Sequence, residues 1–307
     1  MGPMKGLILP APLQRPVEKF ARGFIQPPGR PPVDFSAPVG APSLLPPDSL
    51  SWRIFKNPLA LAVGGIAAVI LELAEPSVRT GVWEHTSFKR APVARLQSTG
   101  LAAMMTVYGP RELSEAMIAR VGRMHTKVQG TTPDGVPYRA DDPVLLDWVQ
   151  ATASFGFMEA YNAYVHPLDD AMRDRLYSES RESSRLYGAV NAPTSLAEMQ
   201  AMFELMAPRL EASPIVFEFL AIMQRAPILP RIGRYGQRLL VKAAVELVPP
   251  WVRERLGLGD EWRLRPWQRA ILKLGGRVAD RLLLRDSPAV QACHRLGLPA
   301  DHLYRPW

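Results

Sequence analysis

Hydrophobic residues recur along most of this chain at intervals of three and four, which is the spacing of amphipathic helices. In the segment 112–129 arginines and a lysine fall on one face of the predicted helix. The other face is lined by the apolar residues Leu113, Met117, Val121, Met124 and Val128. His125 comes four residues after Val121 and three before Val128. The pattern therefore predicts that the imidazole of His125 lies on the buried face.

Residue pairs typical of helix starts precede other amphipathic runs. Asp142-Pro143 and Ser213-Pro214 each place a capping side chain before a proline, which the first turn of a helix tolerates. The first pair predicts a helix that ends near Tyr164. The run Ser195-Leu-Ala-Glu198 has the spacing of a capping box and predicts a further helix start.

The stretch from Asn57 to Leu71 carries no charge. As a helix it would span about 22 Å, which is shorter than the ~30 Å hydrocarbon core of a bilayer. We therefore expect a buried core helix. Its adjacent glycines, Gly64 and Gly65, permit the close approach of another helix or of a flat cofactor.

The C-terminal third contains a second clear apolar stripe, formed by Trp267, Ile271, Leu274, Val278 and Leu282. Basic residues at 265, 269, 273, 277 and 281 lie largely away from it. We expect the stripe to dock on the protein core; the alternative is a helix lying at a membrane interface. Because no alternating strand pattern of useful length appears, the chain is predicted to be all-α.

Prolines divide the chain of 307 residues unevenly, with 12 of the 31 among the first 50. Residues 1–50 are therefore expected to form an irregular arm, and residues 51–307 a single helical domain. No secretory signal is evident. The single cysteine, Cys293, excludes an intramolecular disulfide and a cysteine zinc site. These features favour a cytoplasmic protein, with membrane association as a further option.

The net charge of +8 comes from the C-terminal third, because residues 225–307 hold 16 Lys and Arg against 7 Asp and Glu. Such charge suits an anionic membrane, an acidic partner or nucleic acid, or simply a solvated helix face. No zinc finger, helix-turn-helix or RNA-binding signature accompanies it, so we expect no nucleic-acid partner. Peripheral membrane contact stays open, and the oligomeric state is not predicted.

The histidines limit the possible metal chemistry. None of the five has a glutamate three residues before it, and the HExxH zinc motif is absent, which argues against a carboxylate-bridged di-metal bundle and against a zinc peptidase. A histidine on an apolar face is either a satisfied core residue or an axial ligand to a metal or haem. Haem needs only one protein ligand, which suits so few histidines.

Four motifs follow one another in a distinctive order: Glu84-His-Thr-Ser-Phe88, Arg95-Leu-Gln-Ser-Thr99, Arg123-Met-His-Thr-Lys-Val-Gln-Gly130 and Tyr138-Arg-Ala-Asp-Asp-Pro143. This ordered set resembles the family of the latex-clearing protein (rubber oxygenase) and the MpaB oxygenase. The resemblance covers residues 58–179 and continues more faintly from Leu247.

The resemblance implies a globin-like helical core, with additional helices, around a b-type haem. It makes His125 the proximal ligand and places Arg95 and Thr99 in the haem pocket. The family's lysine before this threonine is replaced by Ser98, which is too short to reach the iron. Many relatives have a histidine where Glu75 stands. We therefore consider Glu75 a candidate distal acid or base, the alternative being a carboxylate at a helix end.

The leading functional hypothesis is a haem-dependent oxygenase that uses dioxygen on a hydrophobic small molecule or polymer. Oxidative cleavage of an isoprenoid-like carbon–carbon double bond is the reaction that the family resemblance suggests. The alternative hypothesis, motivated by the altered distal positions, is a non-catalytic helical carrier of haem or lipid.

Overall fold

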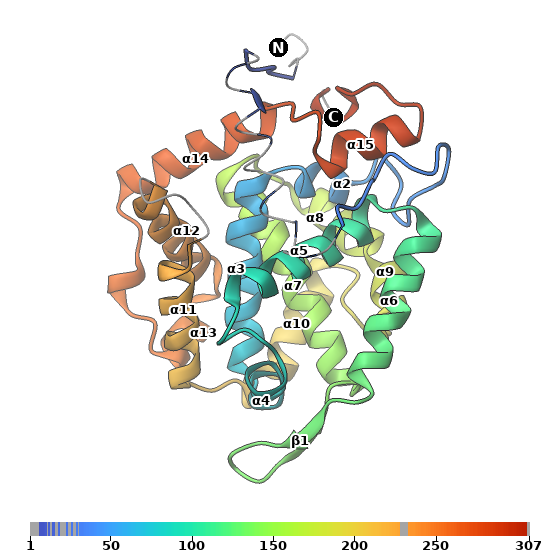
Figure 1. The fold of residues 1–307 in the computed structure, drawn as a ribbon. Coiled ribbons are helices and arrows are strands. Elements are labelled where there is room, and N and C mark those ends of the chain that lie inside the picture. The colour runs from blue at the N-terminus through green and yellow to red at the C-terminus, as the bar shows by residue number, and fades with distance from the viewer. Residues whose placement is uncertain are drawn as a thin grey trace.

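The computed structural model describes residues 6–10, 12, 14–15, 18, 23, 26, 29, 31–227 and 233–305. Its helices are α2 (Leu50–Phe55), α3 (Pro58–Ala74), α4 (Pro76–His85), α5 (Pro92–Tyr108), α6 (Arg111–His125), α7 (Pro143–Tyr164), α8 (Asp170–Glu179), α9 (Arg181–Leu186), α10 (Leu196–Met206), α11 (Pro214–Arg225), α12 (Arg234–Leu247), α13 (Pro250–Leu256), α14 (Pro266–Arg281) and α15 (Pro288–Arg295). They surround a central pair, α3 and α7 (Figure 1). The all-α prediction is confirmed.

Two glycines bring α3 and α7 into backbone contact. A Cβ atom added to Gly156 would lie 2.4 Å from the carbonyl oxygen of Gly64, and one added to Gly64 would lie 2.7 Å from that of Gly156. Both distances are shorter than any van der Waals contact, so only glycine allows this crossing. Gly64 therefore admits a helix, one of the two possibilities that the sequence left open. Gly65 is different, because its nearest neighbour would be a ring carbon of Phe157 at 3.8 Å.

The predicted helix starts are confirmed. The Asp142 side chain accepts hydrogen bonds from the first backbone N–H groups of α7, and this helix ends at Tyr164. Ser195 and Ser213 cap α10 and α11 in the same way. These caps are visible in the sequence because each satisfies its own helix within three residues.

The sequence reading of α6 was wrong in two respects. The helix ends at His125 rather than at residue 129, because the chain turns into a hairpin of β1 (Gln129–Thr131) and β2 (Pro137–Arg139). Strands of three residues are too short to produce an alternating pattern. In addition, the stripe that faces inward runs through Ser114 and Ile118, which are the buried residues of α6, while Leu113 and Met124 are exposed.

The C-terminal stripe was also assigned to the wrong side. Helix α14 buries Gln268, Leu272 and Gly276 and exposes the large apolar residues that were expected to dock, Trp267, Ile271, Leu274 and Val278. The physical reason is close packing, because a Cβ atom on Gly276 would lie 2.4 Å from the carbonyl oxygen of Tyr164 at the end of α7. A small residue, rather than the largest ones, determines which face docks.

A second core joins α2, α5 and α15 to the loop before α2. At its centre the buried guanidinium of Arg295 donates hydrogen bonds to the carbonyl oxygens of Phe35, Ala41 and Tyr108, at 2.6, 2.9 and 2.6 Å, and to the Ser43 hydroxyl at 2.5 Å. All four acceptors are neutral. This cluster therefore satisfies a buried cation by hydrogen bonding alone.

Residues 31–49 form turns and bends, and Phe35, Leu44 and Leu45 within them are buried, whereas much of residues 1–30 lies outside the described residues. No single helix in the described ranges is both long enough and apolar enough to cross a bilayer. Helices α3 and α4 meet that test only as a pair, and they are bent by 111° at their junction.

Candidate functional site

Helix α5 is incompletely covered along its first three turns. None of residues 91–103 is fully buried, whereas Met104, Met105, Val107 and Tyr108 at its C-terminal end are. In the view of Figure 1 the helix crosses the middle of the molecule. The N-terminal part of α5 is thus accessible from outside the protein, whereas its C-terminal end is part of the core.

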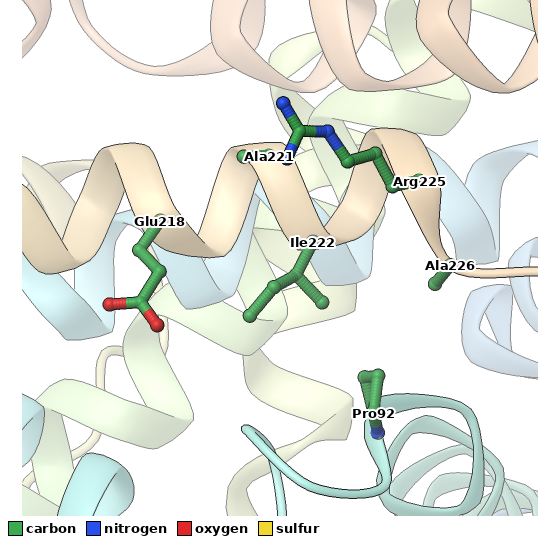
Figure 2. Close-up of a pocket in the computed structure, with 6 residues that line it drawn as sticks. All are labelled: Pro92, Glu218, Ala221, Ile222, Arg225 and Ala226. Carbon is green, nitrogen blue, oxygen red and sulfur yellow. The ribbon is translucent and has the colours of Figure 1, made fainter.

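A cavity of about 440 Å³ opens at the N-terminal end of α5. It is lined by Pro92 of α5 and, on α11, by Glu218, Ala221, Ile222, Arg225 and by Ala226 just beyond that helix. Figure 2 shows Glu218 and Ile222 reaching from α11 toward the side of Pro92, while the side chain of Arg225 turns the other way. The lining is thus largely apolar, with the carboxylate of Glu218 on the same side as Pro92.

His125 is the last residue of α6 and follows Ser114, Ile118 and Val121 along the inward stripe. Its side chain is half-buried, and its ring has no hydrogen-bond partner within the described part of the chain. Burial lowers the pKa of this imidazole, and the positive charge of Arg95 lowers it further, while Asp141 acts in the opposite direction. Burial and Arg95 both favour the neutral form of the ring, which is the form that binds metals.

Arg95 and Thr99 are joined on one face of α5. Nη1 of Arg95 donates to Oγ1 of Thr99 at 2.9 Å, and the Thr99 hydroxyl donates to the carbonyl oxygen of Arg95 at 3.0 Å. Burial lowers the pKa of Arg95, and the charge of Glu72 opposes that shift. Among the described residues its guanidinium makes no other hydrogen bond, so several N–H donors are available to a ligand.

Glu72 is the residue that the sequence reading missed. It lies on α3 and interacts electrostatically with Arg95, which in turn interacts with His125. Burial raises the pKa of its carboxyl to about 7, and the attraction of Arg95 only partly offsets this. A signal was present in the sequence, because Glu72 is the one charged residue of the whole of α3. The structure thus places the Arg95 guanidinium in electrostatic range of a carboxyl on α3 and of the imidazole of His125.

We predict that Glu72→Gln flattens the pH dependence of stability. The pKa of a glutamate is near 4.5 in the unfolded chain and about 7 here, so the folded state binds a proton more tightly. Its contribution is fully present below pH 4.5 and is lost as the pH rises through 7. Urea unfolding between pH 5 and 8 measures this slope. The exposed Glu204→Gln is the control, and an unchanged slope in Glu72→Gln would contradict the assignment.

Glu75 has a different environment from the one expected of an acid or base. It is buried, with one oxygen accepting the backbone N–H of Val78 at 2.7 Å and the other accepting Nη2 of Arg209 at 2.7 Å. It thereby caps the start of α4 and pairs with a cation. The geometry gives Glu75 a structural role at a helix end, and it lies outside the group formed by Glu72, Arg95 and His125.

The donor set of this group fits a haem. The described ranges contain no group of three His, Cys, Asp or Glu that could hold a bare metal ion. A haem needs one neutral imidazole and a cation for its propionates, and His125 and Arg95 meet these two requirements. Ser98 follows Arg95 by three residues on α5 and is half-buried.

Comparison with known proteins gives one family. A sequence model described as "ER-bound oxygenase mpaB/B'/Rubber oxygenase, catalytic domain" matches residues 52–280. The uncharacterized proteins Mb2261 of Mycobacterium bovis and Rv2237 of Mycobacterium tuberculosis are each 29% identical over 119 residues, which is 38% of this chain and 47% of theirs. The match thus spans about half the length of these curated relatives. No solved structure matches.

Proposed function

We propose that this chain, which belongs to the ER-bound oxygenase mpaB/B' and rubber oxygenase catalytic-domain family, is a haem-dependent oxygenase that acts on a hydrophobic substrate. Membership of the family makes it an oxygenase-type catalytic domain. The haem, the substrate and the reaction are our proposal. The observation that carries the proposal is the half-buried imidazole of His125, which has no hydrogen-bond partner among the described residues and lies in electrostatic range of the Arg95 guanidinium.

Each residue has a distinct task in this proposal. When bound, haem b supplies the activation of dioxygen. His125 would provide the single protein ligand, and the lowering of its pKa by burial and by Arg95 favours an unprotonated ligating nitrogen. Arg95 offers its free N–H groups to a propionate or to a developing negative charge, and the hydrogen bonds with Thr99 fix its side chain.

Glu72 adds a proton-transfer group. With a pKa of about 7, its carboxyl is present in both protonation states near neutral pH, so it can release and recover a proton without a large cost. It acts beside Arg95, whose charge favours the ionised form. A carboxyl group with a raised pKa beside a fixed cation is typical of catalytic sites. It therefore favours an enzyme over a carrier.

The cavity at the start of α5 favours an apolar substrate, although none of Glu72, Arg95 and His125 is among the residues that line it. Pro92, Ala221, Ile222 and Ala226 give the cavity between α5 and α11 an apolar lining. Apolar pockets of this kind accept substrates by removing their surface from water. An alkene is consistent with such a lining, and oxidative cleavage of its double bond is the reaction that we propose.

The test combines a spectrum with turnover. We expect the purified chain to bind one haemin with a high-spin ferric spectrum, because Ser98 offers no nitrogen to the iron, and to consume dioxygen with an isoprenoid alkene. Arg95→Ala should lower turnover about 100-fold while retaining most of the haem. The exposed Arg90→Ala is the control. Haem binding without any turnover would support a carrier, and equal loss of haem and turnover in Arg95→Ala would mean that Arg95 mainly holds the cofactor.

A further inference from the structure

Helix α14 displays an apolar stripe on the outside of the protein. The exposed fractions are 47% for Trp267, 52% for Ile271, 65% for Leu274 and 50% for Val278. The spacing of four, three and four residues places them on one helical face. Single exposed apolar residues are ordinary, but four in a row on one helix form a continuous patch.

The stripe is exposed because the opposite face of α14 is held firmly. Asp280 forms an ion pair with Lys56 at 2.6 Å, and Nδ2 of Asn57 donates to the carbonyl oxygen of Gly276 at 3.0 Å. Leu272 and Gly276 pack against the core on this same side. Figure 1 shows the helix along the edge of the molecule, above α11 and α12. The patch is therefore a fixed feature of the folded protein.

Positive charge borders the stripe on one side. Lys273, Arg277 and Arg281 follow at intervals of four residues, and all three are exposed. None of them has an ion-pair partner within the part of the chain that the structure describes, whereas Arg269 pairs with Glu246. The one acid of α14, Asp280, faces Lys56. The outward surface of the helix thus combines apolar and cationic groups with no carboxylate.

The patch continues beyond both ends of α14. At its start Trp267 stacks on Tyr235 of α12, with ring centroids 6.4 Å apart and planes at 8°, and Tyr235 is exposed as well. At its end Leu7 pairs with the backbone at Arg281, and both Leu7 and Ile8 are exposed. Tryptophan and tyrosine are the residues enriched at membrane interfaces, since one part of each ring is apolar and another is polar.

We propose that the outward face of α14 docks this protein on an anionic membrane surface. The stripe from Trp267 to Val278 lies at the boundary between headgroups and acyl chains, and the row Lys273, Arg277 and Arg281 contacts lipid phosphates. A second copy of the chain fits this face poorly. In an antiparallel two-fold pair of α14 helices the three cations would meet their own counterparts, with no carboxylate on the face to compensate.

The first measurement is co-sedimentation of the full chain with vesicles. We expect binding to phosphatidylcholine mixed with phosphatidylserine, little binding to phosphatidylcholine alone, and release at high salt. The double variant Lys273→Gln and Arg277→Gln should bind about 30-fold more weakly, because each basic residue near such a surface contributes about a factor of five. The control is Arg181→Gln with Arg185→Gln, two exposed arginines of α9.

A second variant tests the apolar contribution. Leu274→Asp should abolish vesicle binding, whereas Leu205→Asp, at an exposed leucine of α10, should not. Circular dichroism checks that each variant folds, which we expect because the substituted side chains are exposed. Equal binding by Leu274→Asp, or equal binding to neutral and anionic vesicles, would overturn the proposal. A dimer in light scattering that Leu274→Asp converts to a monomer would also overturn it, by identifying a second copy as the occupant.

Discussion

Replacing His125 with alanine is expected to leave a folded protein that lacks the stoichiometric haem we propose for the parent chain. The ring is half-buried and makes no hydrogen bond among the described residues, so its removal costs little stability. It does remove the one ligand that the site offers to iron. We expect the affinity for haem to fall by more than about 100-fold, because even outer partners of metal ligands are worth about 10- to 100-fold.

Titration with haemin, followed by the Soret band, measures this loss. His294→Ala is the matched control, because His294 is exposed on α15. The variant His125→Gly provides a more specific test. Free imidazole should enter the space left by the ring and restore the Soret band. No such rescue is expected if His125 has only a structural role. An unchanged Soret band in His125→Ala would refute the assignment of the ligand.

Gly156→Ala is expected to destabilise the protein by about 3 kcal/mol. The added methyl group would meet the carbonyl oxygen of Gly64 at 2.4 Å and the backbone nitrogen of Ala68 at 3.2 Å. Neither atom can move unless α3 moves as a whole. This repulsion outweighs the gain of about 1 kcal/mol that alanine has over glycine in a helix.

Gly65→Ala is the control for this substitution, and its effect on the free energy of unfolding should have the opposite sign. Its methyl group would find only a ring carbon of Phe157 at 3.8 Å, an ordinary contact. We expect no loss and a gain of up to about 1 kcal/mol from helix propensity. Urea unfolding of the two variants measures both effects. If Gly156→Ala were as stable as the parent, the crossing of α3 and α7 would be looser than the structure shows.

The sequence predicted most of what depends on neighbouring residues. The caps at Asp142, Ser195 and Ser213 act within their own helices, so their spacing alone revealed where α7, α10 and α11 begin. The all-α fold followed from the same periodicity. The inward position of His125 was also expected. It lies on the face of α6 that contains Ser114, whereas the sequence pattern had placed it on a face with Met124.

The missed features depend on contacts between distant elements. A helix such as α14 has two possible buried faces, and periodicity favours the more hydrophobic one. The choice was made instead by Gly276, whose lack of a side chain lets α14 approach the end of α7. Glu72 was missed for a related reason. Its pKa is raised by burial among the helices packed around α3 and partly lowered again by Arg95, and no local pattern records such an environment.

The Arg295 cluster bears on how the chain is made. Its partners Phe35, Ala41 and Ser43 precede Arg295 by 260, 254 and 252 residues. At a translation rate of about 5–20 residues per second, the loop that contains them waits roughly 13 to 50 s for α15 to emerge from the ribosome. During that interval Trp52 and Tyr108 lack the residues of α15 that belong to the same hydrophobic cluster. The nascent chain therefore leaves apolar surface of this second core uncovered until α15 is synthesised.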